Sequence, residues 1–344
     1  MAYTTINKST DYFNTKLYTG NGGTQSITGV GFQPDLNWTK QRNVNQDNTL
    51  TDSIRGVGKL LFSSDTAAEN TDVNSLTSFN SDGFSVGTSG YMNTNSNTYA
   101  SWNWKANGAG SANTDGSISS TVSANTTSGF SIVSYTGNGS NGASFGHGLG
   151  VKPKIVLIKN RTTAKNWVYW QDTTNNGTSD VRLCLNLTNA NFNNFHVTFG
   201  TSTITLGDTD DAWNKSGDNL IAYCFAEKQG YSKFGSYTGN GNANGTVVYT
   251  GFKPAYVMLK RTDAAGERWN IKDNKRDGYN QTDPVLTADS SGAEYDDAQM
   301  DLLSNGFKIR TSAVSTNASG GTYIYMAFAE APLVGTNNVP CTAR

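Results

Sequence analysis

Two glycine-rich motifs near the middle of the chain have the spacing of known chemical sites. Gly137–Gly142 satisfies Gly-x-Gly-x-x-Gly, which opens a helix onto the pyrophosphate of a dinucleotide. Gly142–Gly146 satisfies Gly-x-Ser-x-Gly, which presents a nucleophilic serine between a strand and a helix. Both sites need a helix directly afterwards, and the glycines that continue to Gly150 prevent one. A catalytic serine triad remains an alternative, because the chain has two histidines, His147 and His196, that could act as its base.

Acidic residues offer two further candidate sites. The stretch Asp208–Asp211 beside Trp213 has the oxygen ligands that calcium prefers, but it lacks the glycine and the terminal glutamate of an EF-hand loop. Glu294–Asp297 could hold a hydrolytic pair, yet no two glutamates share a strand as a glycosidase cleft requires. The histidines and cysteines of the chain do not have the spacing of the ligands in a zinc site. We interpret both stretches as solvated turns, leave calcium near Asp208 as an alternative, and predict no catalytic residue, metal or cofactor.

Composition excludes several classes of protein. The net charge is −1 and the 26 Lys and Arg residues are scattered, so the sequence predicts no basic surface for binding nucleic acid. No apolar stretch is long enough for a membrane span, and the N-terminus lacks a signal peptide. The three cysteines Cys184, Cys224 and Cys341 are too few and too dispersed for a disulfide framework. We expect a protein made in a reducing cytoplasm, without membrane insertion.

The residues that recur in this chain are structural. The pentapeptide Tyr-Thr-Gly-Asn-Gly occurs three times, roughly 100 to 120 residues apart, and each copy is followed by a Gly-x-x-Pro corner. Such glycines supply positive φ angles for a tight hairpin turn, and the proline blocks a helix before the next strand. We therefore predict three copies of one module. The repeated positions are Tyr18, Gly20, Gly22 and Pro34, then Tyr135, Gly137, Gly139 and Pro153, then Tyr237, Gly239, Gly241 and Pro254.

Further landmarks follow in the same order in each copy. An acidic residue comes first, with an arginine three positions later in copies one and three and Asn175 in copy two. Each copy closes on a strand-like segment whose i and i+2 positions are mostly aromatic, which predicts one buried face forming the core of that module. The acidic positions are Asp52, Asp172 and Asp273, and the closing pairs are Trp102 with Trp104, Tyr223 with Phe225, and Met326 with Phe328.

These patterns predict an all-β protein of three tandem antiparallel β-sandwich modules of the jelly-roll or lectin-like type. Short segments rich in β-branched and aromatic residues are bounded by turn residues, and no window has sustained helical periodicity. Residues 107–129 are mostly Ser, Thr, Asn and Gly, so we predict a linker, with Ser117–Ser123 forming an edge strand. We expect module one to be freer than the other two. The predicted boundaries are 1–106, 107–129, 130–226, 231–331 and a tail over 332–344.

Several segments resemble the tandem-repeat virion proteins of tailed phages, particularly phages of cyanobacteria and marine bacteria, which include tail-fibre and lectin-like repeats. The resemblance covers about residues 11–331 and weakens in copy two. It implies a virion component, and a tail fibre or adhesin more than a capsid part. The segments that carry it are Phe130–Gly139, Gly148–Asn160, Ser53–Gly56, Ser81–Gly87 and Tyr99–Ala106.

Two functions follow as expectations. The first is a tail fibre that binds receptors, with repeated weak sites contacting host surface glycans through exposed aromatic side chains. Tyr91, Trp170 and Trp213 are the candidate contacts, because they lie in turn-rich surroundings. The second is a capsid decoration, capsid fibre or tail adaptor that binds only other virion chains, indicated by ordered terminal arms that wrap neighbours. A homotrimer suits both, since fibres generally close around a threefold axis.

Overall fold

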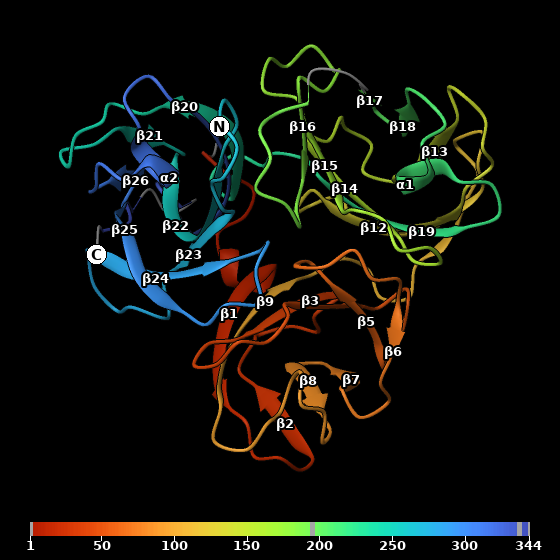
Figure 1. Cartoon of the computed structure of the whole chain (residues 1–344), viewed down its shortest axis with the longest axis horizontal. Helices are drawn as coiled ribbons and strands as arrows, with labels where there is room; N and C mark the ends of the chain where they lie inside the picture. The colour runs from red at the N-terminus through yellow and green to blue at the C-terminus, as the bar shows by residue number, and fades with distance from the viewer. Residues whose placement is uncertain (1–2, 193–196, 336–338, 343–344) are drawn as a thin grey trace.

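A computed structural model of the 344-residue chain describes residues 3–192, 197–335 and 339–342. Over these residues the protein is built from β-strands, with a 3-10 turn η1 (Ser9–Asp11) and two single-turn helices, α1 (Asp211–Asn214) and α2 (Val314–Asn317). The strands form three antiparallel β modules arranged around a common centre, as Figure 1 shows. We call 3–106 module 1, 107–226 module 2 and 227–335 module 3. The predictions of an all-β fold and of three modules are confirmed.

Module 1 has two sheets. They lie face to face and bury residues of alternate strand positions between them. The larger sheet has the order β1 (Phe13–Thr19), β9 (Thr98–Trp104), β3 (Leu36–Gln41), β4 (Thr49–Asp52), β5 (Lys59–Phe62) and β6 (Asn70–Thr71), and the smaller has β2 (Gln25–Thr28), β8 (Gly83–Val86) and β7 (Leu76–Asn80).

Module 2 repeats this plan and adds two strands from the predicted linker. A strand forms a few residues later than predicted, but it pairs on both sides, and the edge of the sheet is the strand before it. The larger sheet has the order β10 (Ser111–Asn113), β11 (Ser120–Asn125), β12 (Phe130–Thr136), β19 (Asn219–Phe225), β14 (Ile155–Asn160), β15 (Val168–Gln171) and β16 (Val181–Cys184), and the smaller has β13 (Ser144–Gly146), β18 (Thr203–Leu206) and β17 (Val197–Phe199).

Module 3 joins both sheets into one that is nearly barrel-shaped. Its long strands β24 and β25 connect the part equivalent to the larger sheet with the part equivalent to the smaller. The order is β20 (Ser232–Thr238), β27 (Thr322–Pro332), β22 (Phe252–Arg261), β23 (Asn270–Asp273), β24 (Thr282–Thr287), β25 (Tyr295–Leu303), β26 (Gly306–Ile309) and β21 (Val247–Tyr249).

The repeated pentapeptide does not close a hairpin, which corrects the prediction from the sequence. The strand that precedes it, β1 in module 1, pairs with β9, and the turn leads instead into the smaller sheet. A buried asparagine that the sequence reasoning missed holds each turn: the backbone N–H of Asn21 donates to Asn93 Oδ1, and that of Gly22 donates to the Asn93 carbonyl. Asn214 and Asn317 hold the other two turns in the same way.

The two glycines of the pentapeptide are required for different reasons. A Cβ on the first would lie 2.2 to 2.3 Å from a backbone oxygen, as at Gly137 against the carbonyl of Lys215. The last glycine has a φ between +67° and +69° in all three copies, as at Gly139. The tyrosine hydroxyl donates to a nearby carbonyl, so that Tyr135 binds Trp213 O at 2.6 Å. The prolines Pro34 and Pro153 stand just before β3 and β14, whereas Pro254 lies inside β22 at a register shift.

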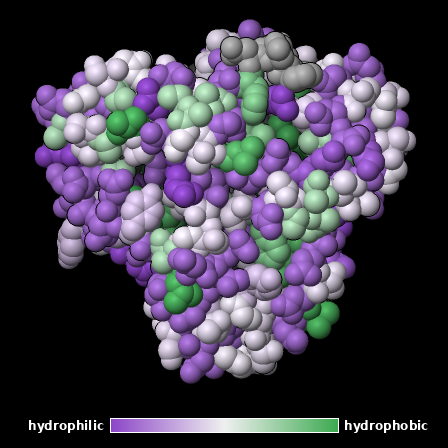
Figure 2. Space-filling model, in the orientation of Figure 1, coloured by the Kyte–Doolittle hydropathy of each residue, from purple (hydrophilic) through white to green (hydrophobic). Residues whose placement is uncertain are grey.

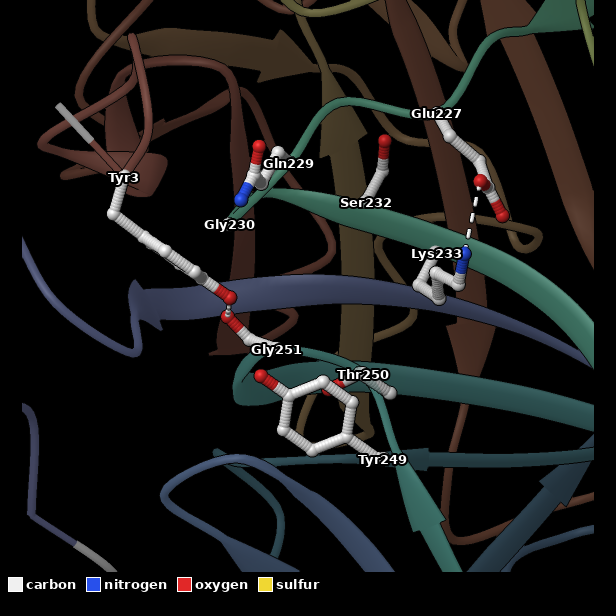
Figure 3. A pocket seen from close by; sticks show the side chains of 9 residues that line it. All are labelled: Tyr3, Glu227, Gln229, Gly230, Ser232, Lys233, Tyr249, Thr250 and Gly251. Carbon is white, nitrogen blue, oxygen red and sulfur yellow. Dashed lines mark hydrogen bonds and ion pairs between the residues drawn. The ribbon is translucent and has the colours of Figure 1, made fainter. Parts of the chain in front are cut away.

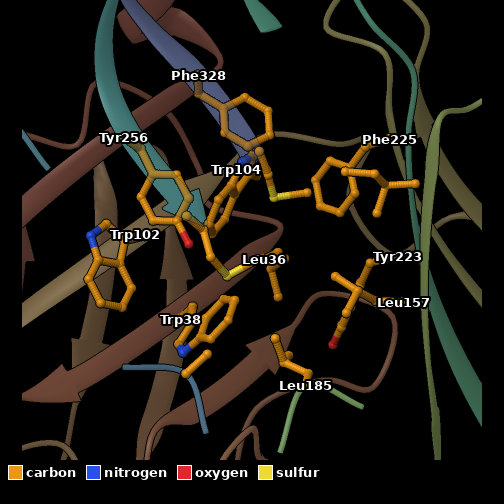
Figure 4. Packing of buried hydrophobic residues seen from close by; sticks show 14 of the residues in the cluster. Leu36, Trp38, Trp102, Trp104, Leu157, Leu185, Tyr223, Phe225, Tyr256 and Phe328 are labelled. Carbon is orange, nitrogen blue, oxygen red and sulfur yellow. The ribbon is translucent and has the colours of Figure 1, made fainter. Parts of the chain in front are cut away.

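The three modules share one hydrophobic core, drawn in Figure 4. Its centre consists of Trp104, Phe225 and Phe328, which occupy the same position in β9, β19 and β27. Their ring centroids lie 6.4 Å (Trp104 to Phe225), 5.6 Å (Trp104 to Phe328) and 5.8 Å (Phe225 to Phe328) apart. The chain therefore closes a pseudo-threefold ring by itself. The expectation that module 1 is freer is wrong, because its Trp104 is part of the common centre.

Hydrogen bonds around this ring repeat the pseudo-threefold relation. At each interface, the side chain of the residue just before β4, β15 or β23 donates to a carbonyl of the neighbouring module. These bonds are Asn48 Nδ2 to Thr287 O at 3.0 Å, Trp167 Nε1 to Phe62 O at 2.7 Å and Trp269 Nε1 to Cys184 O at 3.1 Å.

A buried network of charges joins modules 1 and 2. Arg55 binds Asp52 at 2.5 Å and Glu69 at 3.3 Å, and Glu69 also binds Arg161 of module 2 at 2.8 Å. The hydroxyl of Tyr223 donates to Asp52 at 2.8 Å. Burial alone would raise the pKa of Glu69, but Arg161 and Arg55 hold that pKa below its usual range.

The same network recurs between modules 3 and 1. Arg276 binds Asp273 at 2.6 Å and Glu294 at 3.0 Å, and Glu294 binds Arg42 of module 1 at 2.7 Å. Trp102 Nε1 donates to Asp273 at 3.0 Å. Burial opposes the ionised carboxylate of Asp273, and Arg276 nevertheless keeps the pKa of Asp273 below its usual value.

The interface between modules 2 and 3 lacks this network in the part of the chain that the structure describes. The strand register places Gln171, not Asp172, at the position of Asp52 and Asp273, so the predicted landmark was one residue off. Gln171 donates to Gly235 O at 3.2 Å, while Asp172 accepts from backbone N–H groups of its own loop. Met326, which has no polar hydrogen, takes the place of Trp102 and Tyr223. Matching backbone hydrogen bonds place Thr262 at the position of Arg42 and Arg161, and Asn191 at that of Glu69 and Glu294. These charged positions are thus all neutral at this interface.

Replacing the first glycine of one pentapeptide tests the turn. We predict that Gly137→Ala lowers the free energy of unfolding by about 2 kcal/mol, because the added Cβ meets a backbone oxygen that cannot move freely. Gly278→Ala is the control, since nothing lies within 4 Å of its Cβ, and it should change stability by less than about 0.5 kcal/mol. Urea denaturation measures both, and equal effects would contradict the assignment.

Breaking one charged interface tests whether the modules fold together. Asp52→Asn leaves the guanidinium of Arg55 buried without its closest carboxylate, so we predict a loss of about 3–5 kcal/mol. Asp11→Asn makes the same chemical change in an exposed pair with Lys8 and should cost at most about 1 kcal/mol. The whole chain should unfold in one transition, followed by calorimetry; a separate early transition of module 1 in the wild type would refute the shared core.

Candidate functional site

The three aromatic residues predicted from the sequence to contact a ligand are buried or partly buried in the structure. Trp170 and Trp213 are each 1% exposed and pack edge to face with their centroids 5.0 Å apart. The guanidinium of Arg182 lies over the Trp213 ring at 4.9 Å. Tyr91 is partly buried against Phe62 at 5.0 Å. Trp170 and Trp213 are therefore core residues and not ligand contacts.

The motifs with possible chemistry take structural roles. Ser144, in the Gly-x-Ser-x-Gly motif, lies in strand β13 and bonds Ser117, so no nucleophile elbow forms. His147 is fully buried, accepts at Nδ1 from the N–H of Leu149 and donates from Nε2 to Gly200 O. Burial lowers the pKa of His147, so the ring is neutral near neutral pH. His196 lies outside the described residues.

The acidic stretches are also built into the fold. Asp210 caps α1 by accepting from the N–H of Ala212 at 2.8 Å, and Asp208 accepts from the N–H of Asp210. Asp211 lies 3.2 Å from Lys165. Among the described residues, no group of three or more His, Cys, Asp and Glu side chains could hold a metal ion. Glu294 is committed to the interface between modules 3 and 1.

An open groove on module 3 has the features of a ligand site. It has a volume of about 460 Å³ and is lined by the N-terminal arm and by β20 and β21 with their adjoining turns. Figure 3 shows the ring of Tyr249 at one side and the ion pair of Lys233 with Glu227, 3.0 Å apart, at the other. Tyr249 is 59% exposed, because the outward positions of β21 alternate with the buried Val248. That strand alternation was a usable signal for Tyr249 in the sequence.

The N-terminal arm forms part of the groove wall, although it is more than 200 residues from β20 and β21 in the sequence. The sequence gives no sign of this contact. Tyr3 donates its hydroxyl to Gly251 O at 2.7 Å, and Thr4 donates to Gln229 O at 2.7 Å. Burial, followed by a hydrogen bond with Tyr249, raises the pKa of Tyr3 to about 12, so its phenol stays protonated. The groove therefore offers one exposed aromatic face, neutral hydroxyls and a charged pair.

This combination suits a polyhydroxylated ligand. An aromatic face packs against the C–H side of a pyranose ring, while hydroxyl and carboxylate groups exchange hydrogen bonds with its hydroxyls. The groove is open and its walls are more polar than those of sites for apolar ligands. Figure 2 shows a face of the molecule that is mostly hydrophilic, with only small separate hydrophobic spots. Such a surface offers no large apolar patch on that side.

Three buried lysines are the other titratable groups that stand out, and they too are related by the pseudo-threefold ring. Each is the last but one residue of β3, β14 or β22, and its side chain reaches a carbonyl of the neighbouring module. The contacts are Lys40 Nζ to Ser291 O at 3.0 Å, Lys159 Nζ to Thr66 O at 2.9 Å and Lys260 Nζ to Asn189 O at 2.9 Å. Burial lowers the pKa of all three to about 8. Since each side chain is bound to protein carbonyls, we assign them to assembly of the ring.

Comparison with known proteins gives one match. A family described as "Domain of unknown function (DUF7483)" matches residues 8–332, which includes all three modules. Searches of the curated proteins and of the solved structures found no match. In the part of the chain that the structure describes, no helix is long and apolar enough to cross a membrane.

The lysine ring predicts a dependence of stability on pH. The folded pKa of about 8 lies below the ordinary value of 10.5, so the unfolded chain binds more protons between these limits. The free energy of unfolding should therefore rise from about pH 8 to about pH 9.5, by on the order of 1 kcal/mol per lysine. Urea denaturation at several pH values measures this rise. Lys272, whose pKa burial lowers to about 7, contributes to the same rise, so Lys159→Met should flatten it by about a quarter. A fall in stability over that interval would contradict the assignment.

Proposed function

The chain belongs to the DUF7483 family, and from this premise we propose that it is a non-enzymatic virion protein of a tailed phage, a tail-fibre component that contacts host surface glycans. The groove on module 3 carries the proposal, because it joins an exposed tyrosine face to hydroxyl and charged groups. The resemblance of the repeats to phage virion proteins supports the same reading. No catalytic step is assigned to any residue.

Among the three equivalent positions, only module 3 has an exposed tyrosine, because the modules have diverged there. Pairing of β21 with β26 places Tyr249 opposite Gly306, and the equivalent pairs in the other modules place Thr28 opposite Gly83 and Gly146 opposite Thr203. Only Tyr249 can stack on a sugar. Avidity therefore comes from several copies of the chain and not from three modules. A homotrimer, as proposed for a fibre, would present three grooves around one axis.

The alternative function is a structural virion protein that binds only other virion chains, such as a capsid decoration, a capsid fibre or a tail adaptor. Ordered terminal arms that wrap neighbours would favour it. The described parts of both arms instead return to module 3: Tyr3 and Leu333 both bond the carbonyl of Gly251, and Cys341 bonds Leu333. The arms therefore give this alternative no specific support.

Removal of the exposed ring tests the proposal. We expect Tyr249→Ala to weaken binding to host surface polysaccharide at least about fivefold, measured by isothermal titration, because each stacking contact is worth about 1 kcal/mol or more. Tyr279→Ala is the matched control: Tyr279 is 81% exposed, is not part of the groove and should leave binding unchanged. The purified wild type should also compete with phage adsorption. Unimpaired adsorption by particles that lack this chain would count against host attachment.

A further inference from the structure

The first strand of each module occupies the same place in the ring. Phe13 of β1 pairs with Trp104, Phe130 of β12 pairs with Phe225, and Ser232 of β20 pairs with Phe328. Since Trp104, Phe225 and Phe328 form the common centre, β1, β12 and β20 are structural equivalents. Each pairs along one edge with the closing strand of its module, β9, β19 or β27, and its other edge faces away from that strand. The three outer edges can therefore be compared directly.

Two of these outer edges are already occupied. In module 2, β11 pairs with β12 from Ser120 opposite Tyr135 to Asn125 opposite Phe130. In module 3, two outward N–H groups at the start of β20 are capped: that of Phe234 by Glu227 Oε1 at 2.9 Å and that of Ser232 by the carbonyl of Lys228 at 2.9 Å. Covering or capping an edge is how proteins prevent unwanted strand pairing.

Along Thr15 and Leu17, the outer edge of β1 has neither device; only at the end of β1 does a side chain cap it, where Gln25 Nε2 donates to Thr19 O at 3.1 Å. The only strand that pairs with β1 is β9, within the described residues. The backbone groups of successive residues in a strand point to alternate sides. The carbonyl of Tyr12 and the N–H of Gly20 bond on the side of β9, so even-numbered residues of β1 face β9. The backbone groups of the odd-numbered Thr15 and Leu17 therefore point away from β9. These groups form a ladder ready for one further strand.

A groove of about 320 Å³ runs beside this edge. It is lined by Asn14–Leu17 and Gly29 of module 1 and by Lys275 of module 3. Thr15 is 4% exposed, and its hydroxyl oxygen is buried with no hydrogen-bond partner among the described residues. A buried hydroxyl without a partner costs free energy. For an incoming strand, the groove offers the unpaired backbone ladder of β1 and the space beside it.

The geometry points to an extended segment of a different polypeptide as the occupant: we propose that the outer edge of β1 binds one antiparallel strand, rich in Ser and Thr and carrying a carboxylate. The precedent is β11, whose sequence Ser-Thr-Val-Ser-Ala-Asn fills the equivalent place on β12. Lys16 and Lys275 line the groove and favour an acidic side chain. The described arms of this chain are already bonded to module 3, through Tyr3 and Cys341, so they do not supply the strand.

This site is separate from the glycan groove and binds a different class of molecule. Main-chain hydrogen bonds to an exposed edge give such strand addition its affinity, and the side-chain pockets give it specificity. On a virion particle, the partner would be a neighbouring chain with an extended arm.

A peptide probe tests the proposal on the full chain. The probe is a synthetic peptide with the sequence of residues 118–127 followed by one aspartate, because residues 120–125 form β11. At millimolar peptide, we expect the amides of Thr15 and Leu17 to exchange with deuterium at least about tenfold more slowly, while amides of β20 keep their rates. Unchanged exchange at Thr15 and Leu17, or protection of β20 instead, would overturn the proposal.

A pair of proline variants provides the control. Leu17→Pro removes an outward N–H from β1 without taking a hydrogen bond from β9, so the fold should persist and the peptide effect should disappear. Ser236→Pro makes the equivalent change in β20 and should leave peptide binding intact. Thermal unfolding of both variants confirms that they fold. A homodimer that is abolished by Leu17→Pro, detected by light scattering, would show that a second copy supplies the strand and would overturn the assignment to a different polypeptide. Neither result bears on glycan binding at Tyr249.

Discussion

The contact of Trp104, Phe225 and Phe328 at the centre of the ring is the constraint on which the rest of the structure depends. Each ring comes from the closing strand of one module, and each is at most 3% exposed. Burial of such large side chains contributes roughly 2–3 kcal/mol each. A module separated from the others would present this face to water. The three modules therefore repeat one sequence pattern, but the free energy of unfolding of each depends on the core that they share.

The interfaces around this centre differ in charge, and this difference does not follow the connections of the chain. Modules 2 and 3 are joined by the short stretch around Glu227 to Gly230, and their interface has lost the charged network. Modules 3 and 1 have no direct connection, and their interface keeps Asp273, Arg276 and Glu294. Modules 1 and 2 are joined by an equally short stretch between β9 and β10, and their interface keeps Asp52, Arg55 and Glu69. The length of the connection therefore does not separate the charged interfaces from the neutral one.

Both candidate binding surfaces lie where module 1 meets module 3. The glycan groove combines Tyr3 of the arm with Tyr249, and the strand groove combines Thr15 of β1 with Lys275. Interfaces between modules leave grooves that single sheets do not have, and divergence of a few side chains then suits each groove to a ligand. In the equivalent places of module 2, β11 covers the edge and Gly146 replaces the tyrosine. The loss of symmetry is thus concentrated at the sites proposed for contact.

The sequence by itself determined the β class, the three modules, and the glycine and tyrosine positions of each turn, because these depend on local requirements. A Cβ at Gly137 would clash wherever the module sits, so the residue recurs at a fixed offset. Strand alternation also placed Trp102 and Trp104 correctly on one buried face, and it could have marked Tyr249 as outward.

Only the tertiary structure decided which modules those faces meet, why Trp170 and Trp213 are buried, and where Tyr3 and the outer edge of β1 lie. These depend on contacts between residues far apart in the chain, and a residue type does not specify its distant partner.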